Sequence, residues 1–340
     1  MVSLKDISQE CGVSIATVSK ALNDKDDISE KTKLRVLESA RRMGYLPNLA
    51  AKTLKTRRTY NLGVLFVDEA MSGLTHDYFS YVLDSFKRTA EQKGFDITFI
   101  NCCKKRKNRM TYLEDSRYRG FEGVVIACID FDDPDVKDLV ESGIPVVTID
   151  HAFENHISVV SDNRNGMKDL LEYIYRKGHR RIAYIHGADS SVTKNRISSF
   201  FETAEKLGLN LPDSYIQEAP YRDTETAYEK TEILLALSNP PTCILYPDDF
   251  AALGGMRAIR HAGLKIPDDI SIAGYDGTRT IEYMEPQLTT LKQDTVRIGQ
   301  TAAEQLIGLI EGTRSGAGRQ YLITGSLLEG CTVRDLNQSE

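Results

Sequence analysis

The 340-residue sequence has no tryptophan and only six cysteines, and its apolar runs are short. Runs such as "GVVIACI" at 123–129 fall far below the roughly 20 apolar residues that a membrane-spanning helix needs. The first ten residues, "MVSLKDISQE", lack the basic and then apolar profile of a secretion signal. We therefore expect a cytoplasmic protein with no membrane partner.

The cysteines lie at positions 11, 102, 103, 128, 243 and 331. No two of them form a C-x-x-C pair, and none has a histidine at the spacing typical of a zinc site. This pattern indicates reduced thiols in the core or near the surface. We expect no structural disulfide, no metal site and no cofactor.

Several motifs of common enzymes are also missing. The sequence has no P-loop, no nucleophile elbow and no glycine-rich dinucleotide fingerprint, since "NLGVLF" at 61–66 contains a single glycine. Acidic residues at strand ends could imitate a glycosidase pair, but they serve equally well as hydrogen-bond acceptors for hydroxyl groups. We expect a protein that is not an enzyme.

Charge is distributed unevenly along the chain. Residues 1–60 hold 12 Lys and Arg against 7 Asp and Glu, a net charge of +5, whereas the remaining residues hold 31 against 42, a net of −11. A basic N-terminal segment on an acidic body favours contact with a polyanion through that segment.

The N-terminal segment reads as three short helices. Residues 4–10 form the first, and Gly12 supplies the turn that follows it. Ser14 caps a second helix that runs to about residue 22, with Val13, Val18 and Ala21 facing inward. Ser29 caps a third helix, "EKTKLRVLESARRM", which places Leu34, Leu37 and Ala40 along one face and ends at Gly44. This order is typical of a helix-turn-helix domain.

The outward face of the second helix carries Ile15, Ala16, Ser19 and Lys20. A solvated helix face seldom combines an exposed isoleucine with small residues and a single cation. For reading bases the set is suitable, because small residues let the backbone approach, Ile15 can meet thymine methyl groups and Lys20 can donate to guanine acceptors. Ser14 and Thr17 can bind phosphates.

At this point the sequence resembles the LacI/GalR (lactose-repressor) family of bacterial transcription regulators. The matching features are V-S-x-x-T-V-S-[R/K]-x-L-N at 13–23, G-Y-x-P-N at 44–48 and A-x-x-L ending at Leu54. Lys20 stands where most members carry arginine, and Asp26 and Asp27 precede the third helix. The DNA-binding residues that we predict are Ser3, Leu4, Ser14, Ile15, Ala16, Thr17, Ser19, Lys20, Asn23, Asn48, Ala51 and Leu54.

Residues 48–56, "NLAAKTLKT", are long enough for only about two helical turns, so a helix here is marginal by itself. In the family this hinge pairs with that of a second chain in the minor groove and inserts a leucine between base pairs. The resemblance implies that Leu54 is this wedge and that Ala51 lets the two hinges approach. The alternative is that Leu54 packs on the body.

From residue 61 onward, apolar strands alternate with amphipathic helices. The expected strands are 61–67, 95–101, 123–129, 145–150, 181–187, 243–248 and 271–276, with helices at 78–93, 163–177 and 193–207. Such alternation predicts parallel sheets covered by helices on both faces. About 280 residues exceed one core, so we expect two doubly wound α/β lobes, with crossovers at a strand at 156–161 and at the segment 288–294. The resemblance implies a periplasmic-binding-protein-like body.

The expected domains are a helix-turn-helix domain at 1–47, a hinge and linker at 48–59, and a two-lobed body at 60–340. The first lobe comprises 60–160 and 292–322, and the second comprises 161–291 and 323–336. Carboxylates end four of the predicted strands, at Asp150, Asp162, Asp248 and Asp276, and we expect Asp249 to cap a helix at 250–262. Carboxylates, an arginine and an aromatic face suit a sugar bound between lobes.

The resemblance implies effector contacts at His76, Tyr78, Phe79, Asp150, Arg196, Arg222, Asp248 and Asp276. Asp248 stands where asparagine is commoner, and Arg222 stands where many relatives place an aromatic residue, which the neighbouring Tyr221 could replace. Tyr78 or Phe79 could instead belong to the core.

Taken together, the resemblance predicts a repressor of carbohydrate-use genes, controlled by a mono- or oligosaccharide. Alternatives are the same architecture with a nucleobase or nucleoside effector, or an enzyme that uses the acidic cleft. The C-terminal "TGSLLEGCTVRDLNQSE" has no leucine-heptad helix, so we expect a homodimer. A dimer's twofold symmetry implies a pseudopalindromic DNA operator.

Overall fold

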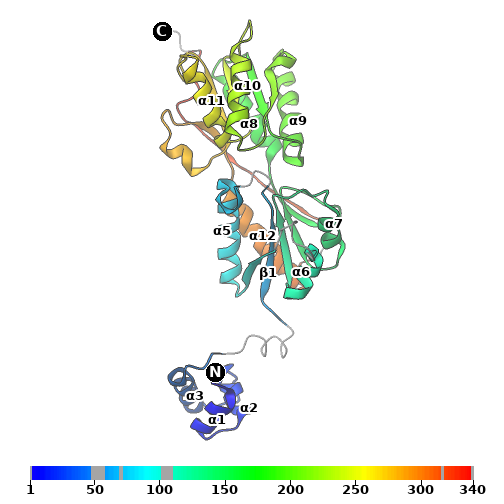
Figure 1. Cartoon of the computed structure of the whole chain (residues 1–340), viewed down its shortest axis with the longest axis vertical. Coiled ribbons are helices and arrows are strands. Elements are labelled where there is room, and N and C mark those ends of the chain that lie inside the picture. The colour runs from blue at the N-terminus through cyan, green and yellow to red at the C-terminus, as the bar shows by residue number, and fades with distance from the viewer. Residues whose placement is uncertain (1, 47–57, 69–71, 101–109, 315–317, 338–340) are drawn as a thin grey trace. The chain divides into compact units, whose positions relative to one another are not determined.

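The chain divides into two compact units, which we call the head (Met1–Thr59) and the body (Tyr60–Glu340). The computed structural model describes residues 2–46, 58–68, 72–100, 110–314 and 318–337 (Figure 1). Among these residues no helix combines the length and the apolar character that crossing a bilayer requires. Asn48, Ala51 and Leu54 lie outside the described residues, so the predicted hinge stays a prediction.

Three helices form the described part of the head: α1 (Leu4–Cys11), α2 (Ile15–Leu22) and α3 (Glu30–Met43). Ser14 and Ser29 cap α2 and α3 by accepting amide hydrogens of the first turn, as the sequence predicts. Gly12 and Gly44 adopt the left-handed conformation that ends a helix. Val18 and Ala21 are buried and Val13 packs against the same cluster, so the predicted inward face of α2 is confirmed.

The predicted core face of α3 is wrong at two positions. Leu34 and Leu37 are 58% and 39% exposed, whereas Lys33, Val36 and Ala40 are buried. Lys33 reaches this face because its aliphatic stem is buried while its ammonium group pairs with Asp24 and Glu30, at 2.8 and 3.1 Å. A reading based on hydrophobicity alone assigns such a lysine to solvent and rotates the helix by about one residue.

The body contains two six-stranded sheets. The first has the strand order β11-β5-β4-β3-β1-β2 and is parallel throughout. Its strands are β1 (Asn61–Phe66), β2 (Asp96–Phe99), β3 (Gly123–Ala127), β4 (Val146–Ile149), β5 (Ile157–Ser161) and β11 (Gln320–Ile323). Its helices are α5 (Asp77–Gln92), α6 (Tyr112–Arg119), α7 (Pro134–Glu141) and α12 (Thr295–Ile310), with the 3₁₀ turn η1 (Gly73–Thr75) before α5.

The second sheet has the order β12-β10-β9-β8-β6-β7, and among its described strands only the pairing of β12 with β10 is antiparallel. Its strands are β6 (Ile182–His186), β7 (Ile216–Glu218), β8 (Cys243–Leu245), β9 (Ser271–Asp276), β10 (Thr289–Lys292) and β12 (Ser326–Leu328). Its helices are α8 (Asn163–Arg176), α9 (Ser191–Lys206), α10 (Thr224–Leu235) and α11 (Asp249–His261), with 3₁₀ turns η2 (Asp213–Tyr215) and η3 (Arg279–Tyr283).

The prediction of a helical head and a two-lobed parallel α/β body is confirmed. Strands β7, β11 and β12 were not expected, because they are only partly buried edge strands and so lack a continuous apolar run. Strand β10 lies in the segment 288–294, which was expected only as a crossover. The chain passes between the sheets after β5, after β10, and between β11 and β12. These three crossings join the lobes.

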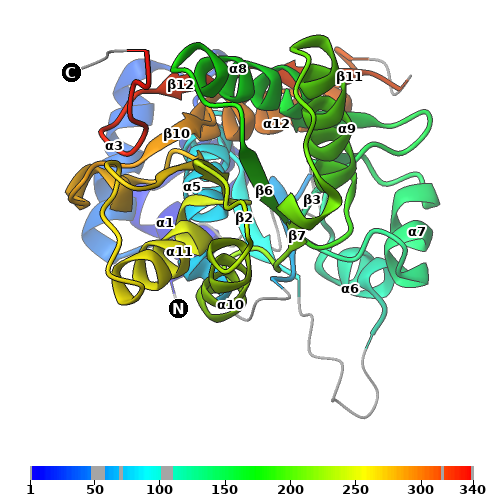
Figure 2. The same ribbon diagram turned by 90° about the horizontal axis from the view of Figure 1, so that it is seen from above.

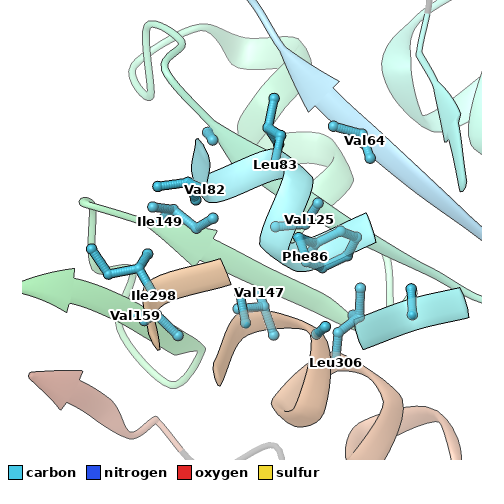
Figure 3. Close-up of a cluster of buried hydrophobic side chains, with 14 of the residues drawn as sticks. Val64, Val82, Leu83, Phe86, Val125, Val147, Ile149, Val159, Ile298 and Leu306 are labelled. Atoms are coloured by element: carbon cyan, nitrogen blue, oxygen red, sulfur yellow. The ribbon is translucent and has the colours of Figure 1, made fainter. Parts of the chain in front are cut away.

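Helices cover both faces of each sheet. In the first lobe Phe86 of α5 and Leu306 of α12 pack on the inward side chains of β1, β3 and β4, such as Val125 and Val147 (Figure 3). In the second lobe α8 and α9 lie on one face and α10 and α11 on the other (Figure 2). Helices α5 and α12 touch closely, since a Cβ on Gly299 would lie 2.1 Å from the carbonyl oxygen of Val82.

Candidate functional site

The outward face of α2 is exposed as the sequence predicts. Ile15 is 48% exposed, Ala16 and Lys20 are exposed, and Thr17 and Ser19 are half-buried. The Ser14 hydroxyl accepts the Thr17 amide hydrogen at 3.0 Å, so part of its hydrogen-bonding capacity holds the helix start. An exposed apolar side chain beside small residues and a cation is a suitable surface for contacting base edges.

Other predicted DNA-contacting residues lie at helix ends. Ser3 is the N-cap of α1 and forms a capping box with Asp6, while Leu4 is half-buried against the head core. Asn23 is exposed at the end of α2, where its side-chain amide donates to the Ser19 carbonyl at 2.7 Å. These residues are accessible enough to contact the phosphate backbone of DNA. Such contacts position a protein on the duplex but do not read the base sequence.

Lys20 has a partner within the head. Its ammonium group forms an ion pair with Asp27, and both side chains are about half exposed (51% and 55%). The Lys20 hydrogen bond lowers the pKa of the Asp27 carboxyl from its ordinary value. A base contact by Lys20 therefore competes with this intramolecular pair.

In the body, the polar residues predicted at strand ends gather where the two lobes meet. Asp150 follows β4, Asp248 follows β8 and Asp276 ends β9. Asp150 and Asp276 both have positive φ angles, 58° and 104°, which non-glycine residues seldom adopt. Backbone strain of this kind gathers at functional sites, and the carboxyl ends of parallel strands are the usual ligand position in such sheets.

Arg196 is the central cation of this cluster and is only 3% exposed. Its guanidinium donates to Asn163 Oδ1 at 2.7 Å and to the Pro247 carbonyl at 2.9 Å, and lies 3.7 Å from Asp276 Oδ1. It also stacks 3.5 Å over the Tyr275 ring. These contacts fix the orientation of the guanidinium. Among the described residues, its remaining nitrogen makes only the long contact with Asp276, so a ligand oxygen can accept a stronger hydrogen bond from it.

Asp150 connects the two lobes. Its carboxylate accepts from the Tyr78 hydroxyl at 2.7 Å and from the Ser161 amide at 3.0 Å. Its backbone carbonyl accepts from Ser191, at the start of α9 in the second lobe, at 2.8 Å. Burial raises the pKa of Asp150 and raises that of the Tyr78 hydroxyl well above its usual range.

Asp248, and not Asp249, caps α11, which corrects the expected cap. Its carboxylate accepts the Ala251 amide hydrogen at 2.7 Å and the Arg222 amide hydrogen at 2.7 Å. Asp249 is the first residue of the helix and instead accepts from Thr290 and Thr278, at 2.6 and 2.7 Å. Both carboxyls are buried, which raises the pKa of Asp248 and raises that of Asp249 to about 7.

Arg222 joins the lobes across the cluster. Its guanidinium donates to Asp77, the first residue of α5, at 2.9 Å and lies 4.5 Å from the centre of the Phe250 ring. Arg222 has a φ of 62°, and the Asp248 carboxylate holds its amide. An arginine at this position bridges the two lobes directly.

The predicted aromatic contacts lie at the start of α5. Phe79 packs edge-on against His76 and Tyr78, with ring centroids 5.0 and 4.8 Å apart. Tyr78 and Phe79 both belong to the hydrophobic cluster of the first lobe, so both of them are core residues, as the alternative prediction had it for one. Burial, with the nearby Arg222 charge, lowers the pKa of His76 to about 4, which keeps the imidazole neutral at pH 7.

Tyr221 lies on the second-lobe side, with its ring 5.8 Å from the Arg196 guanidinium and its hydroxyl 2.8 Å from Thr193 Oγ1. Gly187 is required here, because a Cβ at that position would lie 2.2 Å from the Tyr221 ring. The eight predicted effector residues thus gather at the junction of the lobes, on both sides of it.

Several residues at this junction were not predicted from the sequence. Asp77, Ser191 and Asn163 hold the named residues, and Gln293 donates to Asp276 at 2.6 Å. Asp77 stands directly between His76 and Tyr78, which were both predicted as effector contacts, so a charged residue at that position could have been predicted too. No local pattern marks the others, since each acts through a partner far away in the chain.

Comparison with known proteins identifies the architecture. Residues 3–48 match the description "Bacterial regulatory proteins, lacI family", and residues 171–333 match "Periplasmic binding protein-like domain". The probable HTH-type transcriptional repressor ExuR of Bacillus subtilis is 30% identical over 314 residues, which cover 91% of this chain and 92% of that protein. The chain belongs to the LacI family of bacterial transcription regulators.

Other relatives agree with this LacI-family assignment. The HTH-type transcriptional repressor PurR of Salmonella paratyphi B is 27% identical over 319 residues, with 92% of each chain covered. The solved structure of the Lac repressor dimer bound to operator and the anti-inducer ONPF has a TM-score of 0.83 and 25% identity, covering 98% of this chain and 99% of that one. This LacI-family chain is therefore a DNA-binding transcriptional repressor with an effector-binding body, and not an enzyme.

Proposed function

We propose that this LacI-family repressor binds a pseudopalindromic operator as a homodimer and controls carbohydrate-use genes. A mono- or oligosaccharide bound at the junction of the lobes sets its affinity for the operator. The observation that carries the effector part is the cluster of Arg196, from α9, with Asp150 and Asp276, which lie at the carboxyl ends of strands in different lobes.

The chemistry of this cluster suits a polyhydroxylated ligand. Carboxylates can accept two sugar hydroxyl groups each, and the held guanidinium of Arg196 can donate to ring and hydroxyl oxygens. Phe79 and Tyr78, which pack edge-on against each other at the start of α5, are the aromatic residues that we propose for contact with the C–H groups of a sugar. In the structure these polar groups bond to one another, so hydroxyl groups of a sugar would replace contacts that already exist.

Control of DNA binding follows from the position of the cluster. Asp150, Tyr78 and Asp77 belong to the first lobe, and Arg196, Arg222 and Asp276 belong to the second. A ligand that binds both sets changes how the lobes are held together, within the 1–3 kcal/mol that is typical of allosteric coupling. The proposed hinge, a marginal helix, can respond to a change of that size.

DNA recognition is proposed for the exposed face of α2 and for the hinge residues Asn48, Ala51 and Leu54. The solved Lac repressor is a dimer bound to operator, which supports the same assembly here. Lys20→Ala should relax discrimination at one base position by about 1–3 kcal/mol. A uniform loss across all sequences would make Lys20 a phosphate contact.

The effector proposal is tested by measuring operator affinity during a screen of mono- and oligosaccharides, with nucleobases and nucleosides included. We expect a sugar to change the affinity of the wild type, and Asp276→Asn to abolish that response while sparing DNA binding. Asp294→Asn, which alters an exposed cap of α12, is the matched control and should respond normally. A response only to nucleobases or nucleosides would contradict the sugar assignment.

A further inference from the structure

Three potential metal ligands from distant parts of the sequence meet beside the junction of the lobes. Asp68 follows β1, Cys128 follows β3 and His76 directly precedes α5. One ligand atom of each residue lies within 4.8 Å of those of the other two. Because β1 and β3 are parallel neighbours, their carboxyl ends meet at one edge of the sheet, and α5 begins at the same edge.

The His76 ring supplies a second observation. Its Nδ1 atom is enclosed by protein and has no hydrogen-bond partner. A buried polar nitrogen without a partner is unfavourable, and most such groups in folded proteins are satisfied by protein, water or an ion. The ring is held edge-on against Phe79, so its orientation is fixed by packing.

The carboxylate of Asp68 is also oriented. Its Oδ2 atom accepts hydrogen bonds from the amides of Ser72 and Gly73, at 2.7 and 2.9 Å, and from the Ser72 hydroxyl. Hydrogen bonds of this kind position the carboxylate ligands of metal sites. Cys128 is half-buried, and its φ of 53° marks a turn at the end of β3.

We propose that Asp68, His76 and Cys128 bind a zinc ion. A carboxylate oxygen, an imidazole nitrogen and a thiolate are the three ligand types that zinc accepts, whereas magnesium and calcium require oxygen ligands. The carboxylate and thiolate together neutralise the charge of the ion, which matters because the Arg222 cation acts on His76 electrostatically.

The geometry needs only a small adjustment. Zinc–ligand distances of about 2.0–2.3 Å in a tetrahedral site place ligand atoms roughly 3.3–3.7 Å apart. The present separations extend to at most 4.8 Å, so side-chain rotations of about 1 Å complete the site. Three protein ligands leave a fourth position, which is open to water or to an oxygen of the effector.

This inference departs from the expectation of no metal site, which rested on sequence spacing alone. It does not depend on the identity of the effector. Bound zinc would tie the start of α5 to the ends of β1 and β3, and α5 begins with Asp77, which bridges to Arg222 in the other lobe. Zinc would therefore stabilise the side of the junction that holds that bridge.

The test uses the full chain and the metal alone. Cys102 and Cys103 are replaced by serine in every sample, because these adjacent thiols could themselves bind metal. Zinc is titrated in competition with a chromophoric chelator, and cobalt is titrated separately to detect a thiolate-to-cobalt charge-transfer band. We expect one zinc per chain and one cobalt band.

Cys128→Ser should abolish the cobalt band and weaken zinc binding by more than about 100-fold, because loss of a residue that only hydrogen-bonds to a metal ligand already weakens binding about 10–100-fold. Asp68→Asn and His76→Gln should also weaken zinc binding. Cys331→Ser, which changes an exposed thiol, is the control and should bind as the parent does. Far-UV circular dichroism and metal-free operator binding establish that each variant is folded.

Two results would overturn the proposal. One is a parent protein that does not compete with the chelator for zinc. The other is a folded Cys128→Ser protein that keeps the zinc affinity and cobalt band of the parent, which would place the metal elsewhere.

Discussion

The ion pair between Arg222 and Asp77 should contribute measurably to the stability of the body. The two atoms are 2.9 Å apart, and the side chains are only 11% and 34% exposed. Two unit charges about 4 Å apart interact by roughly 4 kcal/mol at the effective dielectric constant of such a site. Dehydration of both groups and partial solvent screening offset much of this attraction, so we expect a coupling free energy of about 1–2 kcal/mol.

The assay is a double-mutant cycle on the free energy of unfolding, with Arg222→Ala, Asp77→Ala and the double variant unfolded in urea. The control cycle uses Lys87 and Glu91 on the same helix, an i,i+4 pair whose side chains are half exposed (49% and 51%). That pair should couple by only about 0.3–0.5 kcal/mol. A coupling for Arg222 and Asp77 no larger than the control value would refute a stabilising bridge between the lobes.

Three further predictions follow from contacts within single units. Asp27→Asn should release Lys20 and raise operator affinity in fluorescence anisotropy, and an unchanged affinity would show that the pair does not compete with DNA. Burial raises the pKa of Asp249 from 3.8 to about 7, so the folded state keeps a proton that the unfolded state loses, and stability falls as pH rises between these values. Asp249→Asn should make this fall smaller by at most about 4 kcal/mol. Urea unfolding of both proteins at pH 4 and pH 7 measures the change, and an equal fall in the two would contradict the prediction. Gly299→Ala should lower the free energy of unfolding by about 1–3 kcal/mol, and so lower the melting temperature, because its Cβ would meet the backbone of Val82 and Phe86 at 2.1 and 2.8 Å. An unchanged melting temperature would show that α5 and α12 can separate freely.

Much of the fold could be predicted because its signals are local. Serine caps, glycine turns and the inward face of α2 are each encoded within a few residues, and the buried strands are continuous apolar runs. The third helix of the head was harder, because Lys33 occupies a core position through its aliphatic stem. The edge strands β7, β11 and β12 were missed for a related reason, since each is only partly buried.

The candidate site was predictable only in part. Strand-end carboxylates such as Asp150 and Asp276 are visible in the sequence, because they follow apolar runs directly. Their partners are not visible, since Asp77 meets Arg222 across 145 positions of the chain. The exchange of roles between Asp248 and Asp249 could not be foreseen either, because two adjacent aspartates fit the cap equally well until the helix register is known.

The most direct test of the account is operator affinity with and without the effector, compared between the wild type and Arg196→Lys. This substitution keeps the charge at the centre of the cluster but removes the planar fork of donors. We expect the wild type to respond to a small molecule. Without that molecule the variant should bind operator as well as the wild type does, but it should lose most of the response. A full response in the variant would contradict the claim that the junction of the lobes is the effector site.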